Sequence, residues 1–199
     1  MTNYKLPLNR EQAIKLLLEH NSPEDMNHYL ESGAVMHELA EHLGLSEEEA
    51  NYWEMLGLVH DIDWGPTKDN VETHLTKAPE ILKDAGFDEE FIETVLSHGY
   101  GFEELPHLKS KERVQKIQHA LAASETITGL VHAYALMRGN RVSDMEAKGL
   151  KKKFKDKAFA AKIDRGIIIE IEKNGVPLDE FLKVAISGIA KIKDEVGLV

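Results

Sequence analysis

Apolar residues recur every three or four positions along almost the whole chain, which is the spacing of one face of an α-helix. The first such stretch spans residues 10–20. A second begins at Ser22 and Pro23, because serine caps helix N-termini and proline suits the first helical position. We expect this helix to run to Leu43 and stop at Gly44, since glycine favours the left-handed conformation that ends helices.

Further capping and breaking signals divide the rest of the chain. Ser46 and Glu49 form a predicted capping box, which opens a helix that ends near His60. Residues 61 to about 73 are rich in turn formers and predict a loop. Two helices predicted after this loop end at Gly86 and at Gly99. A long helix is predicted over residues 111–138, a shorter one begins at Ser143, and two more span residues 157–174 and 178–196. No stretch of any length alternates as a strand would, so we predict an all-α fold with about eight or nine helices.

The charge of the chain changes character near residue 148. The stretch KGLKKKFKDKAFAAKIDRG is a basic island in an acidic protein. One interpretation is that it joins a metal-binding helical core, residues 1–140, to a C-terminal helical extension, residues 141–199, that packs on the core. The other is a solvated helix face with interspersed acids.

Composition narrows the classes of function. The 199 residues suffice for one compact domain, and the lack of cysteine excludes disulfide frameworks, zinc fingers and thiol nucleophiles. A formal net charge of −11, from 35 acidic and 24 basic residues, argues against nucleic-acid binding, which needs a basic face. The chain shows neither an apolar leader nor a stretch of membrane-spanning length, so we expect a cytoplasmic protein that makes no membrane contact.

Ten histidines are about twice the number that average usage would give, and periodicity directs several of them inward. His28, His60 and His98 each share a helix face with apolar residues, because a helix repeats its face every seven positions. Glu125 lies on the apolar stripe of the longest helix, where glutamate is costly unless it is paired or metal-bound. His132 follows seven residues later on the same face. Surface, helix-end or loop positions are expected for His20, His37, His42, His107 and His119.

These inward residues predict a metal site. Asp61 follows His60 directly, and His74 adds an imidazole from the loop side. Nitrogen and oxygen donors without sulfur suit Mn²⁺, Fe²⁺, Co²⁺, Ni²⁺ or Zn²⁺ rather than Ca²⁺. The expected ligands are His28, His60, Asp61, His74, His98 and Glu125. This set exceeds the needs of one tetrahedral ion and would suit two divalent ions bridged by Asp61.

The order of these residues resembles the HD-domain superfamily of metal-dependent phosphohydrolases. The stretches LGLVHDIDW, VETHLTKAPEILKDAGF and VLSHG are similar to its HDIG-type subgroup, and the resemblance covers roughly residues 10–185. It implies a compact multi-helix HD-domain fold. Two departures matter: Glu125 stands where the family normally has aspartate, and Gly99 follows His98 where some members have a second histidine.

The resemblance implies hydrolysis of a small phosphoester or nucleotide by a metal-activated water. Asp61 would act in catalysis through the metal, while Asp63 would either act as a general base or cap backbone amides. A substrate phosphate could be held by basic residues if they fold over the pocket, namely Lys151, Lys152, Lys153, Lys155 and Arg165. The alternatives are a two-iron HD-type oxygenase and, because Glu125 replaces aspartate, a weakened metal- or ligand-binding module.

Overall fold

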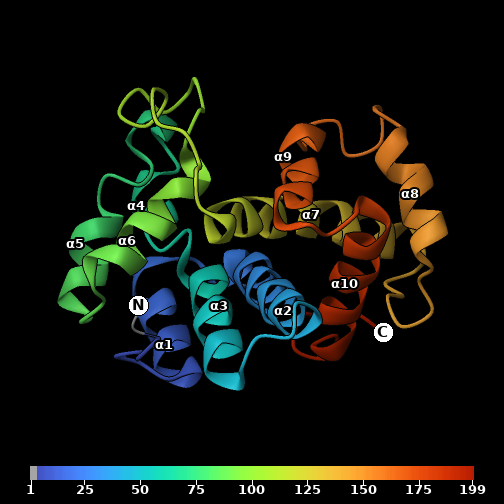
Figure 1. The fold of residues 1–199 in the computed structure, drawn as a ribbon, viewed down its shortest axis with the longest axis horizontal. Coiled ribbons are helices and arrows are strands. Elements are labelled where there is room, and N and C mark those ends of the chain that lie inside the picture. Colours follow the sequence, from blue (N-terminus) through green and yellow to red (C-terminus); the bar gives the residue numbers. More distant parts are fainter. Residues whose placement is uncertain (1–3) are drawn as a thin grey trace.

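The computed structural model describes residues 4–199, which form α-helices, short 3-10 segments and no β-strand (Figure 1). The α-helices are α1 (Arg10–His20), α2 (Met26–His42), α3 (Glu47–Val59), α4 (Trp64–Thr67), α5 (Ala78–Asp84), α6 (Glu89–Leu96), α7 (Lys116–Met137), α8 (Ala147–Lys155), α9 (Arg165–Ile169) and α10 (Leu178–Lys191). The 3-10 segments are η1 (Pro23–Asp25), η2 (Val71–Thr73), η3 (Ser97–Gly99) and η4 (Glu170–Asn174). The predicted all-α class is confirmed, and α4 is only a single turn.

Helix α2 is the centre of the fold, because it packs against α3, α7 and α10. Its contact with α3 is close enough to need glycine on both helices. A Cβ atom on Gly57 would lie 2.5 Å from the carbonyl oxygen of Ser32, and one on Gly33 would lie 3.2 Å from that of Glu54. The two helix backbones therefore touch, which brings the side chains at their facing ends together.

The predicted starts of the first and third helices are confirmed, and the α-helix predicted from Pro23 begins three residues later, at Met26. The Asn9 side chain accepts a hydrogen bond from the backbone N–H of Gln12, and Ser46 forms the predicted capping box with Glu49. Ser22 caps the 3-10 turn η1, which leads directly into α2. These side chains satisfy backbone N–H groups that have no partner within the helix.

The predicted start of the longest helix at residue 111 is wrong, because α7 begins at Lys116. The preceding segment is held in another conformation by Arg113. Its guanidinium donates hydrogen bonds to the carbonyl oxygens of Ser97, His98 and Tyr100, and makes a bidentate pair with Glu170. Those contacts need an extended chain here, so propensity gives way to tertiary hydrogen bonds.

Three further boundaries differ from the prediction. Helix α8 begins at Ala147 without a cap from Ser143, and α10 ends at Lys191. In place of one helix over residues 157–174, residues 156–164 form turns that precede α9 and η4. The Arg165 side chain donates to the carbonyl oxygens of Phe159, Ala160 and Ile163, which satisfies backbone groups that a helix would have satisfied.

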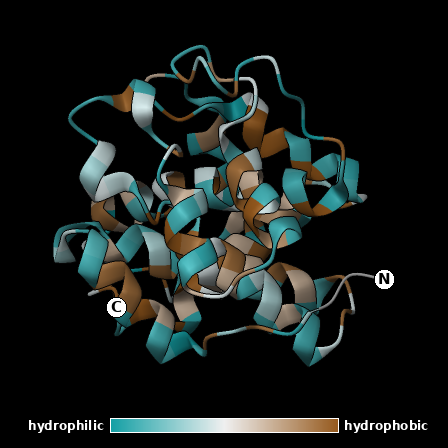
Figure 2. Cartoon of the chain, turned by 90° about the vertical axis from the view of Figure 1, so that its left-hand side faces the viewer, coloured by the Kyte–Doolittle hydropathy of each residue, from teal (hydrophilic) through white to brown (hydrophobic). Residues whose placement is uncertain are grey.

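The C-terminal elements pack on the rest of the chain: α8 and α9 contact α7, and α10 contacts α2. Figure 2 shows brown and teal bands on the same helices, which is the pattern of helices with one buried face. The division at residue 140 stays a prediction. Among the described residues, no helix is long and apolar enough to cross a bilayer.

Candidate metal centre

His60 lies at the end of α3, immediately after Val59, and its side chain is fully buried. Its Nδ1 donates a hydrogen bond to the carbonyl oxygen of Gly57, at 2.8 Å. Because Nδ1 carries the proton, Nε2 presents its lone pair to the interior. The hydrogen bond to Gly57, the residue at which α3 touches α2, therefore also fixes the direction in which this imidazole faces.

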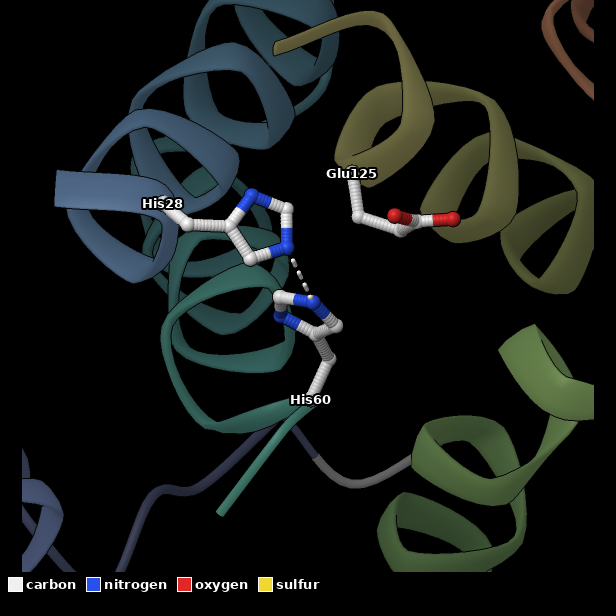
Figure 3. A group of neighbouring side chains, drawn as sticks. All are labelled: His28, His60 and Glu125. Atoms are coloured by element: carbon white, nitrogen blue, oxygen red, sulfur yellow. Dashed lines mark hydrogen bonds between the residues drawn. The ribbon is translucent and has the colours of Figure 1, made fainter. Parts of the chain in front are cut away.

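His28 approaches His60 from α2, and the two Nε2 atoms are 3.1 Å apart (Figure 3). The Nδ1 of His28 lies 3.0 Å from the hydroxyl oxygen of Thr128, which itself donates to the carbonyl oxygen of Glu125. The hydroxyl must therefore accept from Nδ1–H, so His28 also presents an Nε2 lone pair. Two lone pairs at this distance repel unless a cation lies beside them, so the pair fits a metal ion.

His74 and His98 approach Asp61 from the other side. Their Nε2 atoms lie 3.1 Å and 3.2 Å from Oδ1 of Asp61. The Nδ1 of His98 donates to the carbonyl oxygen of Val95, and that of His74 lies 3.1 Å from Oδ1 of Asp63. All four histidines thus direct Nε2 toward Asp61, and acceptors on Nδ1 of His28, His60 and His98 set the tautomers of these three, as is usual for metal-binding histidine.

The two carboxylate oxygens of Asp61 face different histidines. Oδ2 lies 3.5 Å from Nε2 of His60 and 3.8 Å from Nε2 of His28, whereas Oδ1 faces His74 and His98. We call His28, His60, Glu125 and Oδ2 of Asp61 the first ligand set, and His74, His98 and Oδ1 of Asp61 the second ligand set. Neighbouring ligands around one ion are about 3.0–3.4 Å apart when the ligand bonds are about 2.1 Å. The distances of 3.1 Å and 3.2 Å fall in this range, whereas Oδ2 of Asp61, at 3.5 Å and 3.8 Å, and Glu125, within 4.8 Å, would move closer around an ion.

Glu125 comes from α7 and lies beside His28 and His60 (Figure 3). These three residues offer ligand atoms within 4.8 Å of one another, as do His60, Asp61 and His98. One oxygen of Glu125 accepts a hydrogen bond from the hydroxyl of Thr126. The structure thus places Glu125 within the cluster despite its extra methylene.

The charges of the cluster suit a cation. Burial lowers the pKa of His60 to about 3, which keeps its imidazole neutral and able to coordinate. Burial alone would raise the pKa of Asp61, but the neighbouring imidazoles of His60, His74 and His98 hold it well below its usual value. Burial raises the pKa of Glu125, with His98 and His28 opposing that rise. A divalent ion would neutralise both carboxylates.

Asp63 is fully buried and serves the backbone. Its oxygens accept hydrogen bonds from the backbone N–H groups of Leu75, Lys77 and Ala78, where α5 begins. The same carboxylate faces Nδ1 of His74. This geometry favours the capping interpretation over a general base, because the lone pairs of Asp63 are already used and water has no access to it.

A cavity of about 580 Å³ opens beside the first ligand set. It is lined by His28 and Asp61, by the aromatic side chains of Tyr29 and Trp64, and by His132. Sequence reasoning missed Thr128, which orients His28, and Glu31, which lies on the cavity wall and contacts His132. A threonine or glutamate on the inward face of a predicted helix is the signal that could have indicated a hydrogen-bond partner for a buried histidine. His119, which was expected at a surface or helix end, is buried and paired with Glu170.

Three of the five basic residues expected to hold a substrate phosphate make other contacts. Lys151 pairs with Asp179, and Lys153 lies over the rings of Tyr134 and Phe159. Arg165 donates to backbone carbonyl oxygens, as described above. The residues that line the 580 Å³ cavity do not include Lys151, Lys152, Lys153, Lys155 or Arg165. A different lysine, Lys162, lines a neighbouring cavity together with His74.

The fold and this cluster define a helical protein with histidine and carboxylate groups that can hold divalent ions. Comparison with known families agrees: the profile of the HD domain matches residues 25–126, about half of the 199 residues. The chain belongs to the HD domain family. The matched region runs from Asp25, just before α2, to Thr126, and so contains every residue of both ligand sets. Neither the curated proteins nor the solved structures contain a significant match.

Proposed function

We propose that the protein is a metal-dependent phosphohydrolase that acts on a small phosphoester or nucleotide. The observation that carries this proposal is the division of Asp61, whose two oxygens face two separate groups of imidazoles. Such a carboxylate suits a bridge between two ions, which is the arrangement used for displacement at phosphorus. Membership of the HD domain family supports the same class of reaction.

When bound, divalent ions would lower the pKa of a water molecule and stabilise charge on the phosphoryl oxygens. The residues of this chain supply the rest. Asp61 belongs to both ligand sets and so joins them. The carboxylate of Asp63 lies beside Nδ1 of His74 and helps to position that ring. His60 is kept neutral by burial, so it stays available as a ligand at low pH. Tyr29 and Trp64 form the wall along which the leaving group would lie.

A donor set of imidazoles and carboxylates also suits iron, so a two-iron oxygenase is the second candidate. The metal ions that copurify with an untagged protein separate the two. Two redox-active irons and substrate-dependent oxygen consumption would favour the oxygenase. Mn²⁺, Ni²⁺, Co²⁺ or Mg²⁺ that support phosphate release favour the hydrolase. A protein that binds none of these ions when they are added would contradict both and leave a ligand-binding module.

The direct test is Asp61→Ala. Because Asp61 belongs to both ligand sets, this variant should lose both ions and all phosphate release from phosphomonoesters. Helical content by circular dichroism should stay close to that of the natural protein. Asp69→Ala, at an exposed position of the loop that follows α4, is the matched control and should keep metal and activity. Metal content and turnover that survive Asp61→Ala would refute the site.

A further inference from the structure

The wall of the 580 Å³ cavity carries a second histidine–carboxylate pair, separate from the ligand sets. Nδ1 of His132 lies 2.6 Å from Oε1 of Glu31. The Glu31 side chain is 2% exposed, whereas that of His132 is 26% exposed and faces the cavity. Sequence periodicity placed His132 on the face of Glu125 but gave it no partner. A buried carboxylate is costly without a cation beside it, so this pair is a built feature of the cavity.

The pair has a fixed position relative to the metal centre. His28 contacts Thr128 and Glu31 contacts His132, so the same two helices, α2 and α7, carry both contacts. His132 lies four positions after Thr128 on α7, a rise of about 6 Å. A phosphoester with its phosphorus at the ligand sets and its leaving group in the cavity would therefore pass beside His132.

The chemistry of the pair is that of a proton donor. With Nδ1–H directed at Glu31, the other ring nitrogen, Nε2, points away from that carboxylate. The hydrogen bond from Glu31 raises the pKa of His132, against the effect of burial, and so favours the doubly protonated ring. Other ionisable groups on the cavity wall are Glu24 and Asp25 of η1, Tyr29 and His28 of α2, and Asp61.

We propose that His132, held by Glu31, is the general acid that protonates the leaving-group oxygen. This inference rests on the proposed phosphohydrolase function. As the bond between phosphorus and the leaving oxygen breaks, that oxygen takes the proton from Nε2 of His132. The water oxygen forms the new bond to phosphorus and releases a proton to solvent, from which His132 regains one. The substrates favoured are phosphomonoesters of alcohols, whose alkoxide leaves poorly without a proton.

The test compares two substrates in one variant. His132→Gln keeps an N–H donor for Glu31 but cannot transfer a proton. With an alkyl phosphate such as glycerol phosphate, kcat should fall by about 100-fold or more, the range lost with a general acid. With p-nitrophenyl phosphate, whose leaving group needs no proton, it should fall by less than about threefold. Glu31→Gln should show the same selectivity with a smaller loss on the alkyl substrate.

The matched control is His37→Gln, since His37 also lies near a glutamate on α2 but outside this cavity. It should leave both rates unchanged. Equal losses on the two substrates in His132→Gln would show a structural pair and overturn the proposal, as would an unchanged alkyl rate. If the natural protein with Mn²⁺, Co²⁺ or Ni²⁺ releases phosphate from neither substrate, the proposed function fails and the general acid fails with it. A loss of activity on the alkyl phosphate, with activity on p-nitrophenyl phosphate nearly unchanged, is the result that supports His132 as the general acid.

Discussion

The close approach of α2 and α3 at Gly57 should control both stability and metal binding. In Gly57→Ala, the new Cβ would lie 2.5 Å from the carbonyl oxygen of Ser32 and 2.8 Å from Cα of Gly33. Both contacts are with backbone atoms, so no rotamer change can relieve them. Ordinary contact begins near 3.4 Å, so the helices must separate by about 1 Å.

The expected magnitude follows from two opposing effects. Overpacking a close-packed interior costs roughly 1–3 kcal/mol, and contact with backbone belongs at the upper end of that range. Alanine in place of a helical glycine returns up to about 1 kcal/mol through lower backbone entropy. The net loss in the free energy of unfolding should therefore be roughly 2 kcal/mol. The same shift moves His28 relative to His60, so metal affinity should fall by about 10- to 100-fold.

Guanidinium denaturation and titration with Mn²⁺ would measure the two effects. Gly149→Ala is the matched control, because its Cβ meets only atoms of the Tyr134 side chain, which can turn aside. It should unfold within about 0.5 kcal/mol of the natural protein and keep its metal affinity. If Gly57→Ala behaves like Gly149→Ala in both measurements, the helix contact does not set the distance between the two imidazoles, and the reasoning fails.

Three other changes test separate parts of the structure. Glu125→Gln should reduce the ion content from two to one by elemental analysis, because Glu125 belongs to the first ligand set alone; loss of both ions would contradict the division into two sets. Asp63→Asn should cost about 2–3 kcal/mol in denaturant unfolding and weaken metal binding about tenfold, since the amide has one acceptor oxygen where the carboxylate has two, and its NH2 group would face a backbone N–H at the start of α5. Burial alone would raise the pKa of Glu170, but hydrogen bonds from Arg113 and His119 hold it at about 2. A depressed carboxylate pKa stabilises the fold above its unfolded value near 4.5, and this stability is lost as pH falls toward 2. Arg113→Met should remove roughly 2 kcal/mol of it, allowing for screening, so unfolding at pH 7 and pH 2.5 should differ less than in the natural protein.

Local signals predicted the first half of the fold well and the second half poorly. Helices α1 and α3, and the turn η1 that leads into α2, begin at side-chain caps, which are visible in the sequence because cap and helix are adjacent. The start of α7 and the turns before α9 depend instead on Arg113 and Arg165. Each guanidinium satisfies carbonyl oxygens that the chain presents only once it is folded. A basic side chain reads as surface charge in the sequence, so these boundaries had no local signal.

The metal centre shows a similar limit at the level of side chains. Helical periodicity predicted that His28, His60 and His98 face inward, because a face follows from position in the helix alone. The height of one histidine relative to another along the helix axes does not follow from periodicity, because it depends on how α2 and α3 pack. That packing follows from glycines facing backbone carbonyl groups, a relation between residues that no spacing within one helix reveals. Whether two imidazoles meet at 3.1 Å or stand a turn apart is therefore decided by the tertiary contact.

The tautomers of the histidines extend this argument to chemistry. A histidine coordinates through Nε2 only when something accepts the proton on Nδ1. For His60 and His98 the acceptor is a carbonyl oxygen three residues earlier in the same chain segment, which sequence order supplies. For His28 it is Thr128, a residue one hundred positions away, whose own hydroxyl must donate elsewhere for this to work. The candidate ligands can be identified from the sequence, but the tautomers that would let them bind a metal depend on the contacts between the folded helices.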